Sequence, residues 1–194
     1  MTAEPISPVQ LRPLTVAEYL AWPGDPERRY ELQEGSIVMT SRPGIGHRDF
    51  LGELYVQLRP QVPPHLKMIM EIDLDLHLVA PTRPGTVRVP DLLVVTADAH
   101  LRVSRDGGLL RAEDTVLAVE IHSDSTKRTD TAIKHSEYAD AGIGHCWMID
   151  PADGPSLTAC HLAGEFGYIN ASPVRGEITL PAPFPVDLSL GALG

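Results

Sequence analysis

The segment 116–121 reads Val-Leu-Ala-Val-Glu-Ile, an almost wholly apolar run that carries a single acid, Glu120. A run of this kind is typical of a central strand that is covered on both faces. Burying an ionised carboxylate in such a strand is expensive unless a metal ion or a cation pairs with it. We therefore expect the fold to place a positively charged partner beside Glu120.

Asp91 raises the same question in segment 87–96, which predicts another strand. Neighbouring strands can bring Asp91 and Glu120 together at one edge or fork of a sheet. Two carboxylates suit Mg²⁺, a hard cation that keeps several waters and also binds substrate phosphate oxygens. Such an ion can activate a bound water and neutralise the charge that grows on a phosphate. The pair alone does not identify a site, because many proteins have two acids in strands.

A predicted helix over 130–141 follows the loop after Glu120, and it carries Asp130, Lys134 and Tyr138 at four-residue spacing. These three side chains therefore share one face. A lysine on that face can orient the attacking water or stabilise phosphate charge. The alternative is a solvated Asp130–Lys134 pair, which would contribute only a few tenths of a kcal/mol.

Charge limits the partners of the chain. The formal net charge is -10, from 26 acids against 16 lysines and arginines. This balance argues against a protein dedicated to coating DNA, because nonspecific affinity for nucleic acid comes from cations that neutralise phosphates. It leaves room for a nuclease with a local basic patch. Lys127 and Arg128 form the basic cluster nearest to Lys134, and they either contact substrate phosphates or belong to a charged loop.

Length and composition predict one globular domain over residues 1–194, in which 43% of residues are hydrophobic and 22% are charged. Residues 1–13 are expected to form a loose lead-in, and 152–194 a β-rich C-terminal addition. No apolar run approaches the roughly 20 residues of a membrane span. Because the N-terminus lacks the pattern of a secretory signal, we expect the protein in the cytoplasm. Cys146 and Cys160 have no metal or redox spacing.

The order of predicted elements indicates an α/β or α+β fold, with a mixed central sheet flanked by helices and extra C-terminal strands. The first helix is expected to open at the capping box Thr15-Val-Ala-Glu18 and to end at Pro23-Gly24. The remaining elements, in chain order, are a hairpin over 30–40, a helix over 47–62, a long alternating strand over 68–78, a strand over 87–96, a polar connection over 97–115, a strand over 116–121, a helix over 130–141, and strands over 146–149, 157–162, 166–169 and 177–180.

A series of short blocks resembles the Uma2 family of restriction-endonuclease-like proteins. The blocks are Tyr30-Glu-Leu-Gln-Glu-Gly, Gly46-His, Val89-Pro-Asp-Leu-Leu-Val-Val, Val119-Glu-Ile-His-Ser-Asp-Ser-Thr, Asp130-Thr-Ala-Ile-Lys, Tyr138-Ala-Asp-Ala-Gly and Trp147-Met-Ile-Asp-Pro. Each block is short, but their series in this order is specific. The resemblance implies the PD-(D/E)XK nuclease core, a mixed sheet flanked by helices with a divalent metal site at its active edge.

The resemblance also assigns roles to individual residues. Asp91 matches the Asp of the PD element, and Glu120 matches the acid of the (D/E)XK element. The lysine departs from the plain pattern, because His122 stands two residues after Glu120. The resemblance implies that its role passes to Lys134 on the following helix.

Two further residues lie in blocks that resemble the family. Glu31 is a candidate third acid that helps to hold metal or to orient water. The alternative is an exposed strand acid beside a hairpin turn. His47 begins a predicted helix, and it either faces the site or helps to cap that helix.

These residues lead to three hypotheses. In the first, an endonuclease hydrolyses DNA phosphodiester bonds with a metal-activated water, and its Mg²⁺ or Mn²⁺ is held by Asp91 and Glu120 with the assistance of Lys134. DNA is the expected substrate, although the sequence does not separate DNA from RNA. The second is a noncatalytic module for protein interaction or accessory nucleic-acid binding, and the third is a phosphoesterase with another substrate. A homodimer is expected from family habit and from the acidic composition, since pairing could assemble a basic groove.

Overall fold

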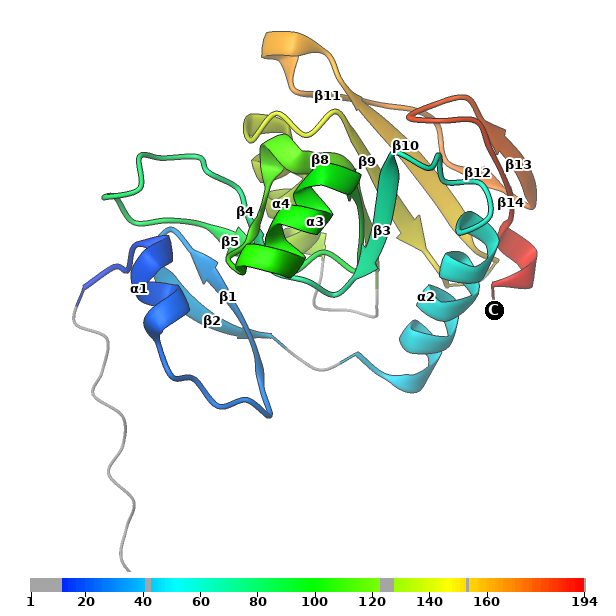
Figure 1. The fold of residues 1–194 in the computed structure, drawn as a ribbon. Coiled ribbons are helices and arrows are strands. Elements are labelled where there is room, and N and C mark those ends of the chain that lie inside the picture. Colours follow the sequence, from blue (N-terminus) through cyan, green and yellow to red (C-terminus); the bar gives the residue numbers. More distant parts are fainter. Residues whose placement is uncertain (1–11, 41–42, 123–127, 153, 194) are drawn as a thin grey trace, which may run out of the picture.

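The computed structural model describes residues 12–40, 43–122, 128–152 and 154–193, with side chains described throughout except at 128–131 (Figure 1). The α-helices are α1 (Val16–Ala21), α2 (Ile45–Leu58), α3 (Ala97–Asp106) and α4 (Arg128–Asp140), and short 3₁₀ helices span Ala112–Asp114, Gly164–Phe166 and Leu190–Ala192. The strands are β1 (Arg29–Gln33), β2 (Ser36–Thr40), β3 (Leu66–Met70), β4 (Leu74–Asp75), β5 (Val87–Arg88), β6 (Leu92–Thr96), β7 (Leu110–Arg111), β8 (Thr115–Ile121), β9 (His145–Asp150), β10 (Ser156–Leu162), β11 (Tyr168–Asn170), β12 (Val174–Arg175), β13 (Glu177–Leu180) and β14 (Val186–Ser189). The expected mixed α and β architecture is confirmed.

A large mixed sheet forms the centre of the molecule, with strand order β11-β10-β9-β8-β6-β3 and with β12 beside β10. Strands β8 and β9 are parallel, and the other neighbours in this sheet are antiparallel. One face is covered by α2 and the C-terminal strands β13 and β14. The other face packs against residues of α3, α4 and the β4–β7 region. Strand β8 is therefore buried on both faces, as its apolar sequence predicts.

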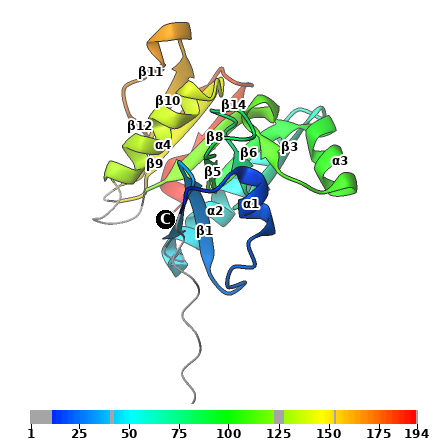
Figure 2. The same ribbon diagram turned by 90° about the vertical axis from the view of Figure 1, so that its left-hand side faces the viewer.

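A smaller sheet, with order β2-β1-β5-β4-β7, lies beside the large one and is joined to it through the segment between β5 and β6. Figure 1 shows its β1–β2 hairpin and α1 at one end of the molecule, far from α2 and the C-terminus. In Figure 2, α3 and α4 are well separated, with β8, β6 and β5 in view between them. This arrangement brings α4, β1 and β5 toward the fork between β6 and β8.

Local signals place the first elements correctly. The Thr15 hydroxyl accepts a hydrogen bond from the Glu18 N–H, and the Glu18 carboxylate accepts one from the Thr15 N–H, so the expected capping box is present at α1. The hairpin also forms, with Gln33 paired to Ser36 across the turn. Gly142 follows α4 with φ of 79° and lies in the left-handed conformation expected of a helix cap.

The prediction of one long strand over 68–78 is wrong. The chain leaves the large sheet after β3 and enters the small sheet at β4, and Glu71 between them has φ of 50°. Leu66 packs in the core cluster that contains α2, whereas Leu74 packs in the opposite one. Alternation of polar and apolar residues reports burial on one side of each piece, so it does not reveal that the pieces belong to different sheets.

Three other expectations need correction. Segment 87–96 is two strands, β5 and β6, interrupted at Val89-Pro90-Asp91, where proline offers no N–H to a ladder. The polar connection over 97–115 contains the helix α3, capped by Thr96, and only Ala99 of that helix is buried. The predicted C-terminal addition is partly wrong, because β10, β11 and β12 belong to the large sheet.

The β1–β2 turn leaves no space for a side chain at Gly35. Its φ is 80°, and an added Cβ would lie 2.6 Å from the Pro13 Cβ and 2.9 Å from the Leu14 backbone nitrogen. We expect Gly35→Ala to lower the free energy of unfolding by about 2 kcal/mol, because both the backbone and the packing oppose it. Urea denaturation measures the change.

The matched control is Gly52→Ala, in the middle of α2, where an added Cβ would meet nothing within 4 Å. This change should leave stability equal or raise it by up to about 1 kcal/mol, since alanine is the better helix former. Equal stabilities for the two variants would contradict the packing of Pro13 and Leu14 against Gly35. Within the described ranges, none of the helices combines the length and apolar character that crossing a membrane requires.

Candidate active site

The fork between β6 and β8 brings Asp91 and Glu120 together. The last paired residues of β6 and β8 at this end are Leu92 and Val119. Asp91 and Glu120 are the next residues beyond this pair, one on each of the two chain segments. Asp91 is just outside β6, and its Oδ2 accepts a hydrogen bond from the Ile121 N–H at 2.7 Å. The side chain thus replaces the ladder bond that β6 no longer supplies. Strand β8 continues beyond the fork, paired with β9.

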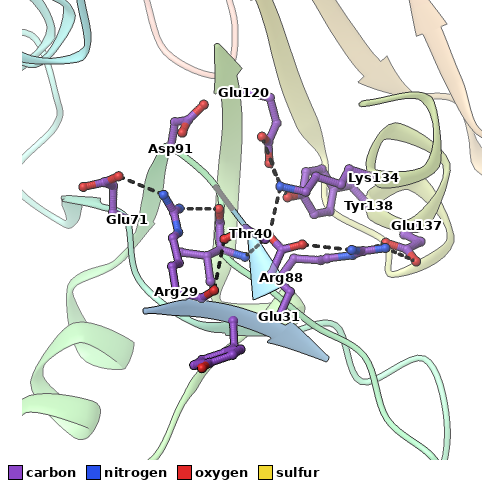
Figure 3. A network of polar contacts seen from close by, with 12 residues as sticks. Arg29, Glu31, Thr40, Glu71, Arg88, Asp91, Glu120, Lys134, Glu137 and Tyr138 are labelled. Atoms are coloured by element: carbon purple, nitrogen blue, oxygen red, sulfur yellow. Dashed lines mark hydrogen bonds and ion pairs between the residues drawn. The ribbon is translucent and has the colours of Figure 1, made fainter. Parts of the chain in front are cut away.

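Glu120 has the cationic partner that its position requires. The Lys134 Nζ lies 3.4 Å from Glu120 Oε2, and the Tyr138 hydroxyl donates to Glu120 Oε1 at 2.6 Å (Figure 3). Both partners come from one face of α4, as their spacing predicts. All three residues are buried. The reading of Lys134 as part of a solvated helix pair is therefore wrong.

Glu31 is buried inside the same network. The Lys134 Nζ lies 3.0 Å from Glu31 Oε1, so one ammonium group lies within ion-pair distance of both Glu31 and Glu120. The backbone N–H of Val89 donates to Glu31 Oε1 at 3.0 Å. The alternative of an exposed hairpin acid is excluded, since the Glu31 side chain is only 2% exposed.

Arg88 supports this network from behind, and sequence reasoning did not include it. Its Nη1 donates to Glu31 Oε2 at 2.9 Å, while its Nε and Nη2 donate to the two carboxylate oxygens of Glu137 at 2.6 and 2.8 Å (Figure 3). Arg88 needs partners for the same reason as Glu120, because it places a charge between Val87 and Val89 in a buried strand. Glu137 carries no such signal, because a helix acid is ordinarily solvated.

His47 faces the site and does not cap its helix. Its Nε2 lies 3.0 Å from Asp91 Oδ1, and the N-cap of α2 is Gly44, without a side-chain bond. The His47 ring is buried, and its Nδ1 has no hydrogen-bond partner among the described residues. A histidine that bonds to a ligand carboxylate fixes the orientation of that carboxylate.

Three predicted residues are not placed by these contacts. Lys127 lies outside the described residues, as do the side chains of Arg128 and Asp130 at the start of α4. The predicted phosphate contacts of Lys127 and Arg128, and the supporting role of Asp130, stay predictions.

The three acids of the site have pKa values that are shifted in different directions. Burial raises the pKa of Glu120 to about 7, with the Lys134 charge acting against this rise and the Asp91 charge adding to it. Burial also acts on Asp91, but the hydrogen bond and charge of His47 hold its pKa below the ordinary value. For Glu31, the effect of burial is outweighed by the Lys134 charge, the Val89 N–H and Arg88, which together lower its pKa.

The donor set fits a metal ion that takes few protein ligands. Each carboxylate oxygen that accepts one hydrogen bond keeps a second lone pair, so Asp91 and Glu120 can still offer oxygens to Mg²⁺ or Mn²⁺. Within the described ranges, no group of three or more His, Cys, Asp and Glu side chains is placed so that it could hold a metal ion. Waters and substrate phosphate oxygens would complete the coordination of such an ion.

Comparisons with known proteins identify the family and the fold. The Uma2 family, described as "Putative restriction endonuclease", matches residues 16–192. A crystal structure described as a "putative nuclease belonging to DUF820" from Anabaena variabilis has a similar fold, with a TM-score of 0.70 at 20% sequence identity. The similarity covers 93% of this chain and 97% of that one. No curated protein matches the sequence significantly. Because the family match spans nearly the whole chain, this protein belongs to the Uma2 family.

Proposed function

We propose that this protein is a metal-dependent nuclease that hydrolyses phosphodiester bonds at the fork between β6 and β8, with DNA as the expected substrate. The observation that carries the proposal is the shared position of Lys134, which lies within ion-pair distance of Glu31 and Glu120 beside Asp91. The description of the family as restriction endonucleases and of the similar structure as a nuclease supports this choice.

Asp91 and Glu120 would hold Mg²⁺ or Mn²⁺ in this proposal. A bound ion supplies a water of lowered pKa and neutralises charge on the phosphate. His47 keeps Asp91 oriented through the contact at 3.0 Å, and Tyr138 does the same for Glu120 through its bond at 2.6 Å. Each ligand carboxylate is thereby held before substrate arrives, which lowers the cost of organising the site during the reaction.

Lys134 would orient the attacking water and stabilise the phosphate charge. Its ammonium group is held within ion-pair distance of both Glu31 and Glu120, which fixes its place at the fork. Glu31 is fixed in turn by Arg88 and by the Val89 N–H, so the position of Lys134 depends on the small sheet as well as on α4.

Lys134→Met tests the proposal. We expect Mg²⁺- or Mn²⁺-dependent cleavage of double-stranded, single-stranded or branched DNA by the wild type. The variant should cleave about a hundredfold more slowly, the size of effect that loss of one positioned proton-transfer group produces. Rates are measured on labelled oligonucleotides under single-turnover conditions.

Lys67→Met is the matched control, because Lys67 is exposed on β3. This variant should cleave DNA at the wild-type rate. Thermal melting confirms that both variants are folded. An absence of cleavage of every DNA form by the wild type, or equal rates for Lys134→Met and Lys67→Met, would contradict the proposal. The same cleavage assay with RNA oligonucleotides and with a panel of small phosphate esters shows whether the protein acts on a different substrate.

A further inference from the structure

A cleft of about 390 Å³ adjoins the carboxylate site and has no role in the proposal above. Three of its lining residues are connected to the Asp91 segment. The Glu71 N–H donates to the Asp91 carbonyl at 3.1 Å, and the Arg29 Nη2 donates to the Val89 carbonyl at 2.8 Å. Arg48 directly follows His47, which contacts the Asp91 carboxylate. Figure 3 shows Arg29 and Glu71 next to Asp91, so the cleft begins at the edge of the site.

Aromatic side chains form one wall of this cleft. Tyr19 and Tyr30 line it, and both also line an adjoining hollow of about 210 Å³ that includes Trp22. The Trp22 and Tyr30 rings meet edge to face with centroids 4.7 Å apart, and the Tyr19 hydroxyl donates to the Tyr30 carbonyl at 3.1 Å. All three residues are partly exposed. Rings that are held by their own contacts and keep an open surface are suited to stacking with nucleobases.

Some of the charged side chains that line the cleft have ion-pair partners, and others have none among the described residues. Arg29 is paired with Glu71 at 2.8 Å, and Arg28 is paired with Asp25 at 3.2 Å. Arg48 is exposed, and its side chain has no ion pair or hydrogen bond among the described residues. Asp73 is partly buried, lines both hollows, and has no hydrogen bond within the described ranges. The cleft therefore offers one cation and one acceptor group beside an aromatic wall.

We propose that this cleft holds one unpaired nucleotide of the substrate strand, next to the bond that is cut. Arg48 contacts a backbone phosphate, the tyrosine rings contact the base, and Asp73 accepts hydrogen bonds from the base edge. The proposal rests on the nuclease function proposed above and specifies its substrate as a strand with an unpaired base.

The chemistry of Asp73 selects among the bases. A carboxylate offers only acceptors, and guanine is the base that presents neighbouring donors, its ring N1–H and its amino group, along one edge. Stacking on aromatic rings depends little on net charge, whereas duplex binding depends on many cation–phosphate contacts. Stacking therefore lets a chain of formal net charge -10 hold nucleic acid at one place.

Binding can be measured separately from cleavage. Fluorescence anisotropy without divalent metal compares a short oligothymidylate with one central guanine, the same strand without guanine, and the guanine strand annealed to its complement. The guanine strand should bind about fivefold or more tightly than the all-thymidine strand, and the duplex should bind least. Asp73→Asn should remove the preference for guanine. Arg48→Gln should weaken binding of both single strands equally.

Arg59→Gln and Asp98→Asn are matched controls, because both residues are exposed and neither lines the cleft. In cleavage assays, Arg48→Gln should raise KM and leave kcat unchanged. The inference would be overturned if the duplex bound as tightly as the single strands. It would also be overturned if Asp73→Asn and Arg48→Gln both bound the single strands with the affinity and guanine preference of the wild type. Cleavage that does not depend on Arg48 overturns only the cleft assignment, whereas Arg48-dependent binding without any cleavage overturns the nuclease function.

Discussion

Arg88→Met is expected to lower the free energy of unfolding by about 4 kcal/mol, the cost of breaking a buried ion-pair group by removing one partner. The Arg88 side chain is 1% exposed and donates to both Glu31 and Glu137. Its removal leaves the buried Glu31 carboxylate with Lys134 as its remaining cation and leaves Glu137 without its described partner. Urea denaturation at neutral pH measures the loss.

A matched variant separates this effect from the loss of an ordinary arginine. Arg105→Met removes an exposed arginine that pairs with Asp106, and it should change stability by less than about 1 kcal/mol. Adding Glu31→Gln and Glu137→Gln to Arg88→Met should recover much of the lost stability, because no unpaired buried charge is left. If Arg88→Met unfolds at the same urea concentration as Arg105→Met, the ion pairs of Arg88 do not hold the small sheet against α4.

Glu120→Gln should abolish metal-dependent cleavage and at the same time change how stability depends on pH. The pKa of Glu120 is raised from its ordinary 4.5 to about 7 in the folded protein. The folded state therefore keeps the proton longer than the unfolded state as pH rises. The associated stability is present below about pH 4.5 and is lost as pH rises through 7, by about 3 kcal/mol in total.

The glutamine variant lacks this loss because its side chain does not titrate. The stability of Glu120→Gln relative to the wild type should increase by about 2.5 kcal/mol between pH 5 and pH 8 without metal. Urea denaturation at both pH values measures this difference. Glu53→Gln, an exposed change on α2, should show the same pH dependence as the wild type. If the difference in stability between Glu120→Gln and the wild type did not change with pH, burial would not raise the pKa of Glu120.

Local chemistry made several features predictable. The apolar sequence around Glu120 predicts a buried strand that requires a cation, and the four-residue spacing of Lys134 and Tyr138 predicts that they share one face of a helix. Both are observed. The capping box at Thr15 is local as well, since its hydrogen bonds join residues three positions apart, and the turn at Gly35 follows from the residue pair Glu34-Gly35.

The missed features depend on contacts between distant segments. Alternation over 68–78 does not show where the chain changes sheets, because both pieces bury alternate residues. Arg88 joins Glu31 and Glu137 across 57 and 49 positions, and no short motif records such a partnership. Helix α3 escaped prediction because its sequence is polar on average and it buries only Ala99. The resemblance to the family supplied the role of Lys134, which spacing left open.

Calorimetric titration with Mn²⁺ tests most directly whether Asp91 and Glu120 form one metal site. Asp91→Asn keeps the size of the side chain and an oxygen that can accept the Ile121 N–H, but it removes the charge that a divalent ion requires. The wild type and Asp98→Asn, an exposed control on α3, should bind Mn²⁺ with the same affinity. Asp91→Asn should show no binding. Wild-type affinity in the folded Asp91→Asn variant, or no binding by the wild type, would contradict the site.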